Sequence, residues 1–303
     1  MVTVLALMAL MMPLFSGAVD IRQLRQLAAR HNVTCVLVFG DSSVDPGNNN
    51  RLPTTMKGNF PPYGKDFFDR HPTGRFSNGR LATDFIAEAL GYTKIIPAFL
   101  DPNLKPADLL HGQVLPVSRQ IEYLKHYKLH LSRLVGGKKA QNIVKNAIFV
   151  LSMGTNDFLQ NYFLEPTRPK QFTVEQYQNF LASRMFQDIK EMNRLGATRV
   201  VVVGVPPLGC MPLVKTLAGQ NTCVESYNQA SCDDLFVYSA GLVETSKGCC
   251  GSGTIEYGDT CKGLTTCADP SKYAFWDAVH PTEKMYRILA GEAIESLSET
   301  LID

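Results

Sequence analysis

The fold is most clearly indicated by Val36-Leu-Val-Phe-Gly-Asp-Ser-Ser-Val-Asp-Pro-Gly-Asn-Asn-Asn50, an apolar run that ends at a glycine and enters a serine-containing turn. Residues 36–39 are β-formers without polar alternation, which is typical of a strand buried on both faces. Gly40 allows the backbone to leave the sheet sharply. We therefore predict that Ser42 lies at the carboxyl end of a strand, where open α/β sheets bind ligands. A hydroxyl there is a candidate nucleophile, and an ordinary turn serine is the alternative.

A second motif, Trp276-Asp-Ala-Val-His-Pro-Thr-Glu283, lies near the C-terminus. Asp277 precedes His280 by three residues, a separation that lets its carboxylate reach the imidazole Nδ1 atom. Pro281 biases His280 toward extended geometry and, with Thr282, is predicted to open a helix that runs to about residue 297. A capping pair without a catalytic role is the alternative.

A third motif follows the apolar run 147–152, which predicts another buried strand. This run continues into Met153-Gly-Thr-Asn-Asp157, so Asn156 also follows the carboxyl end of a strand. Its side-chain amide is suited to donate a hydrogen bond to an oxyanion, and a plain turn is the alternative. The three motifs together, with the serine first and the histidine last, favour acyl transfer over three unrelated turns.

The segments between these motifs alternate between strand and helix patterns. Apolar residues recur every three or four positions, and the predicted helices are 81–90, a helix capped by Ser118 that runs to about 135, and a helix after a Thr173–Gln176 capping box that ends at Gly196. Residues 199–203 form the next buried strand. This β-α-β-α-β order predicts a parallel sheet with helices on both faces. A long Asn-, Pro- and Gly-rich loop is expected after Ser42.

These residues carry a resemblance to a known family. The motifs Phe39-Gly-Asp-Ser42, Gly47-Asn-Asn-Asn50, Gly154-Thr-Asn-Asp157 and Asp277-Ala-Val-His280-Pro281 resemble those of the plant GDSL esterase/lipases, within the SGNH hydrolase superfamily. The resemblance runs from about Val33 to Leu297. It implies a flavodoxin-like three-layer α/β/α domain that hydrolyses carboxylic esters with a catalytic triad of Ser42, His280 and Asp277. The Ser42 backbone N–H and the Asn156 amide would form the oxyanion hole, and no metal or cofactor would be needed.

Composition places the chain among single-domain globular proteins. It has 303 residues, 45% hydrophobic and 19% charged, and a net charge of +2 with no basic block, so a nucleic-acid partner is not expected. Residues 2–15 are apolar and uncharged and precede Ser16-Gly17-Ala18, which predicts a signal peptide over residues 1–18 and one hydrolase domain over 19–303. An uncleaved anchor is the alternative, and no later segment is long enough to span a membrane. We therefore expect a secreted protein, with a glycosylation sequon at Asn32.

Eight cysteines fit an oxidising compartment. Five of them gather in a region with few apolar residues, where disulfides would stabilise most: Cys223, Cys249, Cys250, Cys261 and Cys267. Their pairing cannot be deduced from sequence. A zinc site is disfavoured because the region has neither a Cys-x-x-Cys pair nor a histidine. Cys35 is expected to be a buried thiol.

Two segments of the family pattern are missing. The block resembling Gly-Val-x-Phe-Ala-Ser-x-Gly, which supplies an oxyanion N–H, should lie between residues 97 and 118, and only Gly112 matches its first glycine. A helix, a strand and a helix are missing between residues 230 and 241, where Leu235–Tyr238 could form a strand of four residues at most. We therefore expect three strong strands where the fold needs five, with exposed sheet edges at 36–39 and 200–203. Excised coding segments are the leading explanation.

The sequence thus predicts a secreted serine esterase or lipase that acts on acyl or lipid esters and is weakened by the missing block. Two alternatives stay open. One is a catalytically impaired or non-catalytic truncated isoform. The other is an acyltransferase that uses the same residues and differs only in which acceptor reaches the site.

Overall fold

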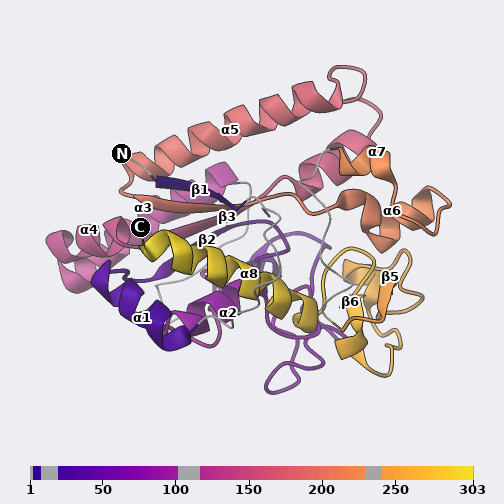
Figure 1. Cartoon of the computed structure of the whole chain (residues 1–303), viewed down its shortest axis with the longest axis horizontal. Helices are drawn as coiled ribbons and strands as arrows, with labels where there is room; N and C mark the ends of the chain where they lie inside the picture. The colour runs from indigo at the N-terminus through magenta and orange to yellow at the C-terminus, as the bar shows by residue number, and fades with distance from the viewer. Residues whose placement is uncertain (1–2, 8–19, 102–116, 230–240, 303) are drawn as a thin grey trace.

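The computed structural model describes residues 3–7, 20–101, 117–229 and 241–302 (Figure 1). Its strands are β1 (Thr3–Leu7), β2 (Val36–Gly40), β3 (Ile148–Ser152), β4 (Arg199–Val203), β5 (Glu244–Gly248) and β6 (Tyr273–Phe275). Its α-helices are α1 (Ile21–Arg30), α2 (Ala82–Ala89), α3 (Val117–Val135), α4 (Gly137–Lys145), α5 (Val174–Arg194), α6 (Pro212–Leu217), α7 (Glu225–Asn228) and α8 (Glu283–Ile302). A short π-helix spans Asp157–Leu164.

The central sheet is parallel, with strand order β1-β4-β3-β2. Every residue of β2 and β3 is buried, as expected for apolar runs without polar alternation. The three strands predicted from sequence are therefore confirmed. A separate two-stranded sheet pairs β5 with β6.

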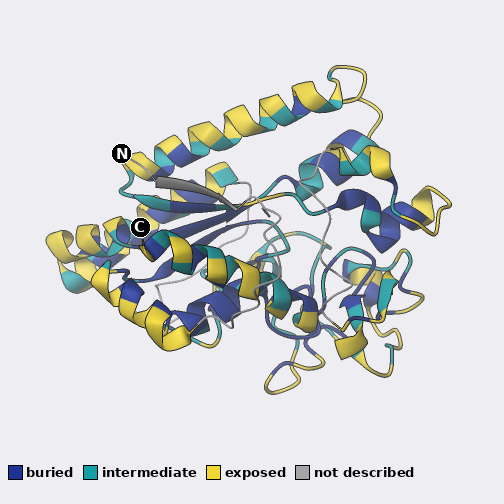
Figure 2. Cartoon of the chain, viewed as in Figure 1, coloured by how far each residue is buried: buried dark blue, intermediate teal, exposed yellow. Residues whose placement is uncertain are grey.

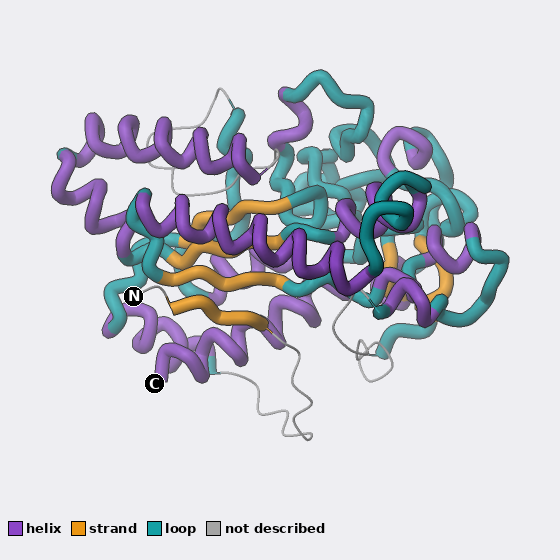
Figure 3. Tube along the Cα trace, turned by 90° about the horizontal axis from the view of Figure 1, so that it is seen from above, coloured by secondary structure: helices purple, strands orange, loops and turns teal. Residues whose placement is uncertain are grey.

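Helices cover both faces of the central sheet (Figures 1 and 3). On one face, α1, α2 and α8 pack against residues such as Val36, Val38 and Val150. On the other face, α3, α4 and α5 pack against Leu37, Phe39 and neighbouring residues of β3 and β4. Alternate side chains of each strand thus enter opposite cores, and Figure 2 shows the buried sheet between largely exposed outer helix faces. The expected three-layer α/β/α architecture is confirmed.

Several helix boundaries differ from the sequence prediction. Helix α3 already includes Val117, so Ser118 lies inside the first turn and is not the cap. Helix α8 begins at Glu283 and extends to Ile302, and Thr282 Oγ1 accepts a hydrogen bond from the Met285 N–H at 3.2 Å. The predicted capping box at Thr173 is confirmed, because its side chain and that of Gln176 bond each other's backbone N–H groups. Helices α1 and α4 were not predicted.

One expected sheet edge is occupied. Strand β1 pairs with β4 over its whole length, from Thr3↔Arg199 to Leu7↔Val203. The expectation that residues 200–203 form an edge is therefore wrong in this structure, because five residues of the expected signal segment supply a fourth strand. The possible strand 235–238 and the Gly112 segment lie outside the described residues. Among the residues that are described, no helix is long and apolar enough to cross a membrane.

Strand β2, the other expected edge, is the last strand of the described sheet. The backbone groups of its last residue, Gly40, are nevertheless hydrogen-bonded. The buried side chain of Gln120, from α3, accepts a hydrogen bond from the Gly40 N–H at 2.9 Å and donates one to the Gly40 carbonyl at 2.7 Å. These two bonds supply what a neighbouring strand residue would supply at this position. The backbone leading into the Ser42 turn is thereby fixed on its outer side.

Candidate active site

The sheet register brings the ends of three strands level. Gly40, Ser152 and Val203 are paired neighbours at the carboxyl edge. A side chain at residue 40 would place its Cβ 2.0 Å from the Ser152 carbonyl oxygen, so only glycine permits this close approach. The next residue, Asp41, donates its N–H to that same carbonyl at 3.1 Å. Ser42 therefore begins its turn from a fixed point on the sheet.

Ser42, His280 and Asp277 form one continuous chain of hydrogen bonds. The Ser42 hydroxyl oxygen lies 2.8 Å from His280 Nε2. On the far side of the ring, Nδ1 lies 2.8 Å from Asp277 Oδ2 and 3.0 Å from Oδ1. His280 is 4% exposed and Asp277 is fully buried, so water has little access to the carboxylate. The sequence-predicted residues from the two ends of the chain thus meet within hydrogen-bond distance.

The Asp277 carboxylate also orders the turn that carries the histidine. Its Oδ1 accepts the N–H groups of Val279 at 2.8 Å and His280 at 2.7 Å, while the Trp276 N–H donates to the His280 carbonyl at 2.7 Å. The segment is a tight turn between β6 and α8 and not a helix. One carboxylate therefore both orders its own turn and contacts the imidazole, while its catalytic role stays a prediction.

Two other serines near the motif have different partners. The Ser43 hydroxyl lies 3.1 Å from the Ser152 hydroxyl. The buried Ser77 hydroxyl lies 3.3 Å from both the Asn78 side-chain oxygen and the Pro281 carbonyl. Of these three serines, Ser42 is the one bonded to His280.

Two aromatic residues of the long loop that follows Ser42 contact His280 and Asp277, and no sequence pattern predicted these contacts. The Phe76 ring stacks on the His280 ring, with centroids 4.8 Å apart and planes 26° apart. The Tyr63 hydroxyl donates to Asp277 Oδ2 at 2.7 Å. Only the density of Pro and Gly in this loop marked it as functional, because no local pattern identifies which loop residue contacts a site more than 200 positions away.

Buried charges hold the loop itself. Asp45 accepts the N–H groups of three following residues, the closest being Asn48 at 2.6 Å. Arg75 donates to the Pro46 carbonyl at 3.1 Å and forms a two-point ion pair with Asp84, both bonds being 2.9 Å long. Both side chains of this ion pair are buried, so removal of one would leave the other charge buried and unpaired and would destabilise the fold. The segment that follows Ser42 is thus anchored to α2.

Asn156 lies four residues beyond β3, half-buried, immediately before the π-helix. Because β3 pairs with β2, Asn156 and Ser42 follow adjacent strands at the same edge of the sheet. The neighbouring Asp157 carboxyl has its pKa raised by burial, and nearby Asp41 also raises it. This arrangement agrees with the sequence-based placement of Asn156, and its role stays a prediction.

The cysteine-rich region is cross-linked by disulfides, as expected. The bonds are Cys210–Cys223, Cys249–Cys267 and Cys250–Cys261. The backbone N–H of Cys250 donates to the Trp276 carbonyl at 2.8 Å, which attaches this lobe to the segment that carries Asp277. Cys35 is a buried thiol, as predicted, and burial raises its pKa to about 12. Cys232 lies outside the described residues.

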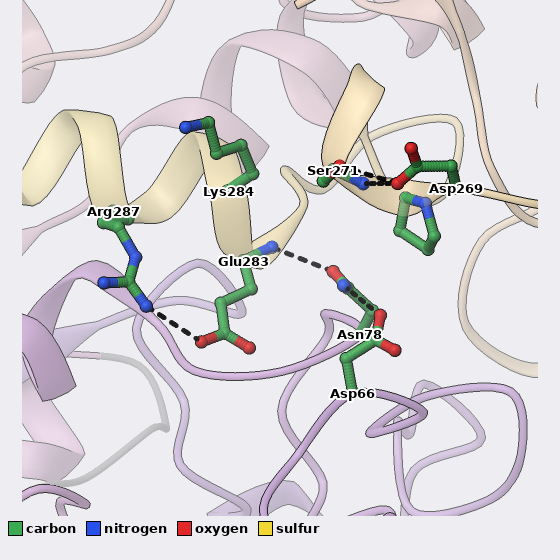
Figure 4. A pocket seen from close by; sticks show the side chains of 8 residues that line it. Asp66, Asn78, Asp269, Ser271, Glu283, Lys284 and Arg287 are labelled. Carbon is green, nitrogen blue, oxygen red and sulfur yellow. Dashed lines mark hydrogen bonds and ion pairs between the residues drawn. The ribbon is translucent and has the colours of Figure 1, made fainter.

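A polar pocket of about 300 Å³ adjoins the first turn of α8 (Figure 4). It is lined by Asp66, Asn78, Asp269, Pro270, Ser271, Glu283, Lys284 and Arg287 and contains none of the predicted site residues. Asn78 in its wall accepts the Glu283 N–H at 2.8 Å and donates to Asp66 at 2.7 Å. Its polar groups thereby hold the start of the helix that follows His280. Within the described ranges, no group of three or more His, Cys, Asp or Glu residues is placed to hold a metal ion.

A serine bonded to an imidazole, which is bonded in turn to a buried carboxylate, is the arrangement that serine hydrolases use for acyl transfer. The family model described as GDSL-like Lipase/Acylhydrolase matches residues 36–293. The chain belongs to this family and is a carboxylic ester hydrolase of the esterase/lipase type.

Two relatives from Arabidopsis thaliana illustrate the similarity. The chain is 50% identical to GDSL esterase/lipase At5g45950, with 94% of each chain covered. It is 37% identical to GDSL esterase/lipase APG, with 88% of this chain and 91% of the relative covered. The first alignment extends over 335 positions, more than the 303 residues present here, so the relative has residues inside the matched region that this chain lacks.

Proposed function

We propose that this chain hydrolyses acyl or lipid esters by two-step acyl transfer at Ser42. His280 takes the serine proton as the hydroxyl attacks the ester carbonyl, and it then protonates the leaving alcohol. Asp277 orients the imidazole and stabilises the imidazolium. Water then attacks the acyl-enzyme with the same base. The observation that carries this proposal is the unbroken hydrogen-bond chain from Ser42 to the buried Asp277 carboxylate.

The experiment that tests this function is hydrolysis of a series of p-nitrophenyl esters by the purified chain. We expect acid and p-nitrophenol in equal amounts, with a preference among acyl lengths. Adding a competing alcohol and analysing the products separates hydrolysis from acyl transfer. Full turnover to a new ester with no free acid would assign the site to a transferase, and a folded chain that cleaves no ester would contradict the proposal.

Asn156 is proposed to donate to the oxyanion together with the Ser42 backbone N–H. We expect Asn156→Ala to lower kcat by about 10² to 10³-fold with little change in KM, because the bond forms only in the transition state. Steady-state kinetics on one p-nitrophenyl ester measures both constants. A change in KM alone would make Asn156 a substrate-binding or structural residue.

We further propose that the chain is a weakened member of its family. The surplus of aligned positions in the relative supports internal losses, and the missing glycine block would leave the oxyanion one donor short. Restoring a Gly-Val-x-Phe-Ala-Ser-x-Gly segment after Leu110 is expected to raise kcat by about 10² to 10³-fold. The parent chain and a relative carrying both segments serve as references in the same assay. Equal kcat values and equal stabilities of the parent chain, the restored chain and the relative would refute the proposal that this chain is weakened.

Secretion remains part of the proposal and is supported by three disulfides, which suit an oxidising compartment. Asn32 is exposed at the end of α1, which leaves the sequon accessible to a glycan. Cleavage after residue 18 would remove β1 and expose β4 as a sheet edge. Mass analysis of the secreted chain would give its first residue and any glycan.

A further inference from the structure

We propose that Tyr63 is a positioning residue for ester hydrolysis, acting through Asp277. The inference rests on the proposed triad and adds a fourth side chain to it, supplied by the loop 41–81. Tyr63 lies in the loop that follows Ser42, 214 positions before Asp277, and the residue is 1% exposed. Within the described residues its hydroxyl hydrogen-bonds neither Ser42 nor His280, so the influence of the hydroxyl passes through the carboxylate.

The Tyr63 hydroxyl bonds the carboxylate oxygen that lies nearer to the imidazole. Asp277 Oδ2 accepts from the Tyr63 hydroxyl at 2.7 Å and lies 2.8 Å from His280 Nδ1. The other oxygen, Oδ1, lies 3.0 Å from Nδ1 and also accepts the Val279 and His280 backbone N–H groups. Without Tyr63, every remaining donor to the carboxylate in the described part of the chain would come from the turn that carries it. Among the described residues, Tyr63 is thus the one side chain outside this turn that hydrogen-bonds the carboxylate.

A second hydrogen bond orients the Tyr63 hydroxyl. The Gly258 N–H donates to the Tyr63 oxygen at 2.7 Å, which occupies the acceptor side and directs the phenolic proton to Asp277. Phe60 and Phe76 meet the tyrosine ring edge-on, with centroids 5.7 and 5.8 Å away. Burial, and then the charge of Asp277, raise the pKa of Tyr63 well above its usual range, so the hydroxyl keeps its proton.

This geometry has a kinetic consequence. A hydrogen bond to a charged group is stronger than a neutral one, and its loss lets the carboxylate rotate away from Nδ1 just when the imidazolium needs it. We expect Tyr63→Phe to lower kcat by about 10- to 100-fold. KM should change less than about twofold, because the hydroxyl bonds Asp277 and Gly258 and not the substrate.

Tyr286→Phe is the matched control. Tyr286 is also a buried tyrosine, and its hydroxyl has no hydrogen-bond partner among the described residues. The same chemical change there should leave kcat within about twofold of wild type. Thermal unfolding of both variants identifies any loss of folded protein, and rates are expressed per folded monomer after gel filtration.

A double-mutant cycle with Asp277→Ala separates positioning from general support of the fold. If Tyr63 acts through the carboxylate, Tyr63→Phe should change kcat less than about twofold once the carboxylate is absent. Equal fold-losses in both backgrounds would overturn the inference. The downfield proton resonance of the His280–Asp277 bond gives a readout that needs no turnover. It should move in Tyr63→Phe but not in Tyr286→Phe, and an unmoved resonance in both would also overturn the inference.

The outcome of Ser42→Ala distinguishes this inference from the function on which it rests. Undiminished hydrolysis by Ser42→Ala would remove the triad and the role of Tyr63 together. Loss of hydrolysis in Ser42→Ala, with wild-type kcat in Tyr63→Phe, would leave the triad standing and refute Tyr63 alone.

Discussion

Replacing His280 or Ser42 with alanine is expected to lower kcat by about 10⁶-fold, the scale seen when one member of a serine–histidine pair is removed from a triad enzyme. The reason lies in the geometry: Ser42 Oγ and His280 Nε2 are 2.8 Å apart, so the imidazole is placed to act as the base for the proposed nucleophile. Both variants should stay folded, because Ser42 lies in a turn and His280 retains its backbone bonds. Single-turnover hydrolysis of an activated ester measures the loss.

The double variant sharpens this prediction. If the two side chains act as one unit, as proposed, Ser42→Ala with His280→Ala should be no slower than either single variant. Ser43→Ala is the matched control, since it removes an adjacent hydroxyl that pairs with Ser152 instead. Turnover near the wild-type rate in His280→Ala would end the proposed mechanism.

Replacing Asp277 with asparagine is expected to lower kcat by about 10⁴-fold. An asparagine amide that presents its NH₂ group to Nδ1 would stabilise the tautomer in which the imidazole proton is on Nε2. Because Nε2 is then already protonated, it cannot accept the proton of Ser42. Lost stabilisation of the imidazolium adds to the effect. The side chain is fully buried, so water cannot replace the lost acceptor. Steady-state kinetics with a p-nitrophenyl ester provides the value.

Asp277 also caps its own turn, so the asparagine variant needs a structural control. Near-ultraviolet circular dichroism of the buried Trp276 next to it reports whether the turn is preserved. A preserved turn with a loss of less than about tenfold would show that the carboxylate is not part of the mechanism.

The sequence predicted those parts of the fold that local patterns encode. Strands β2, β3 and β4 are uninterrupted β-former runs, and Thr173 with Gln176 is a local capping signal, so these elements are where they were expected. Helix ends were less predictable, because several residues near a boundary can cap, and Thr282 took that role at α8. Strand β1 was missed because an apolar segment near the N-terminus fits a signal sequence as well as a strand.

The candidate site also contains residues that local motifs predict and residues that they do not. Ser42, Asp277 and His280 were expected together from their motifs, and the structure places them within hydrogen-bond distance, while their roles stay predictions. Tyr63 and Gln120 carried no such signal. Each contacts the site from a distant segment, Tyr63 across 214 positions and Gln120 across 80, and such contacts depend on the path of a loop or helix and not on local spacing. Disulfide partners were hidden for the same reason.

Ser42 as the nucleophile is tested most directly by covalent labelling of the purified chain with a serine-directed fluorophosphonate, followed by mass spectrometry of its peptides. We expect one adduct per folded chain on Ser42, formed in parallel with loss of ester hydrolysis, and no adduct in Ser42→Ala. An adduct on Ser43 or Ser77, or hydrolysis that persists in the unlabelled Ser42→Ala chain, would contradict the assignment of Ser42 as the nucleophile.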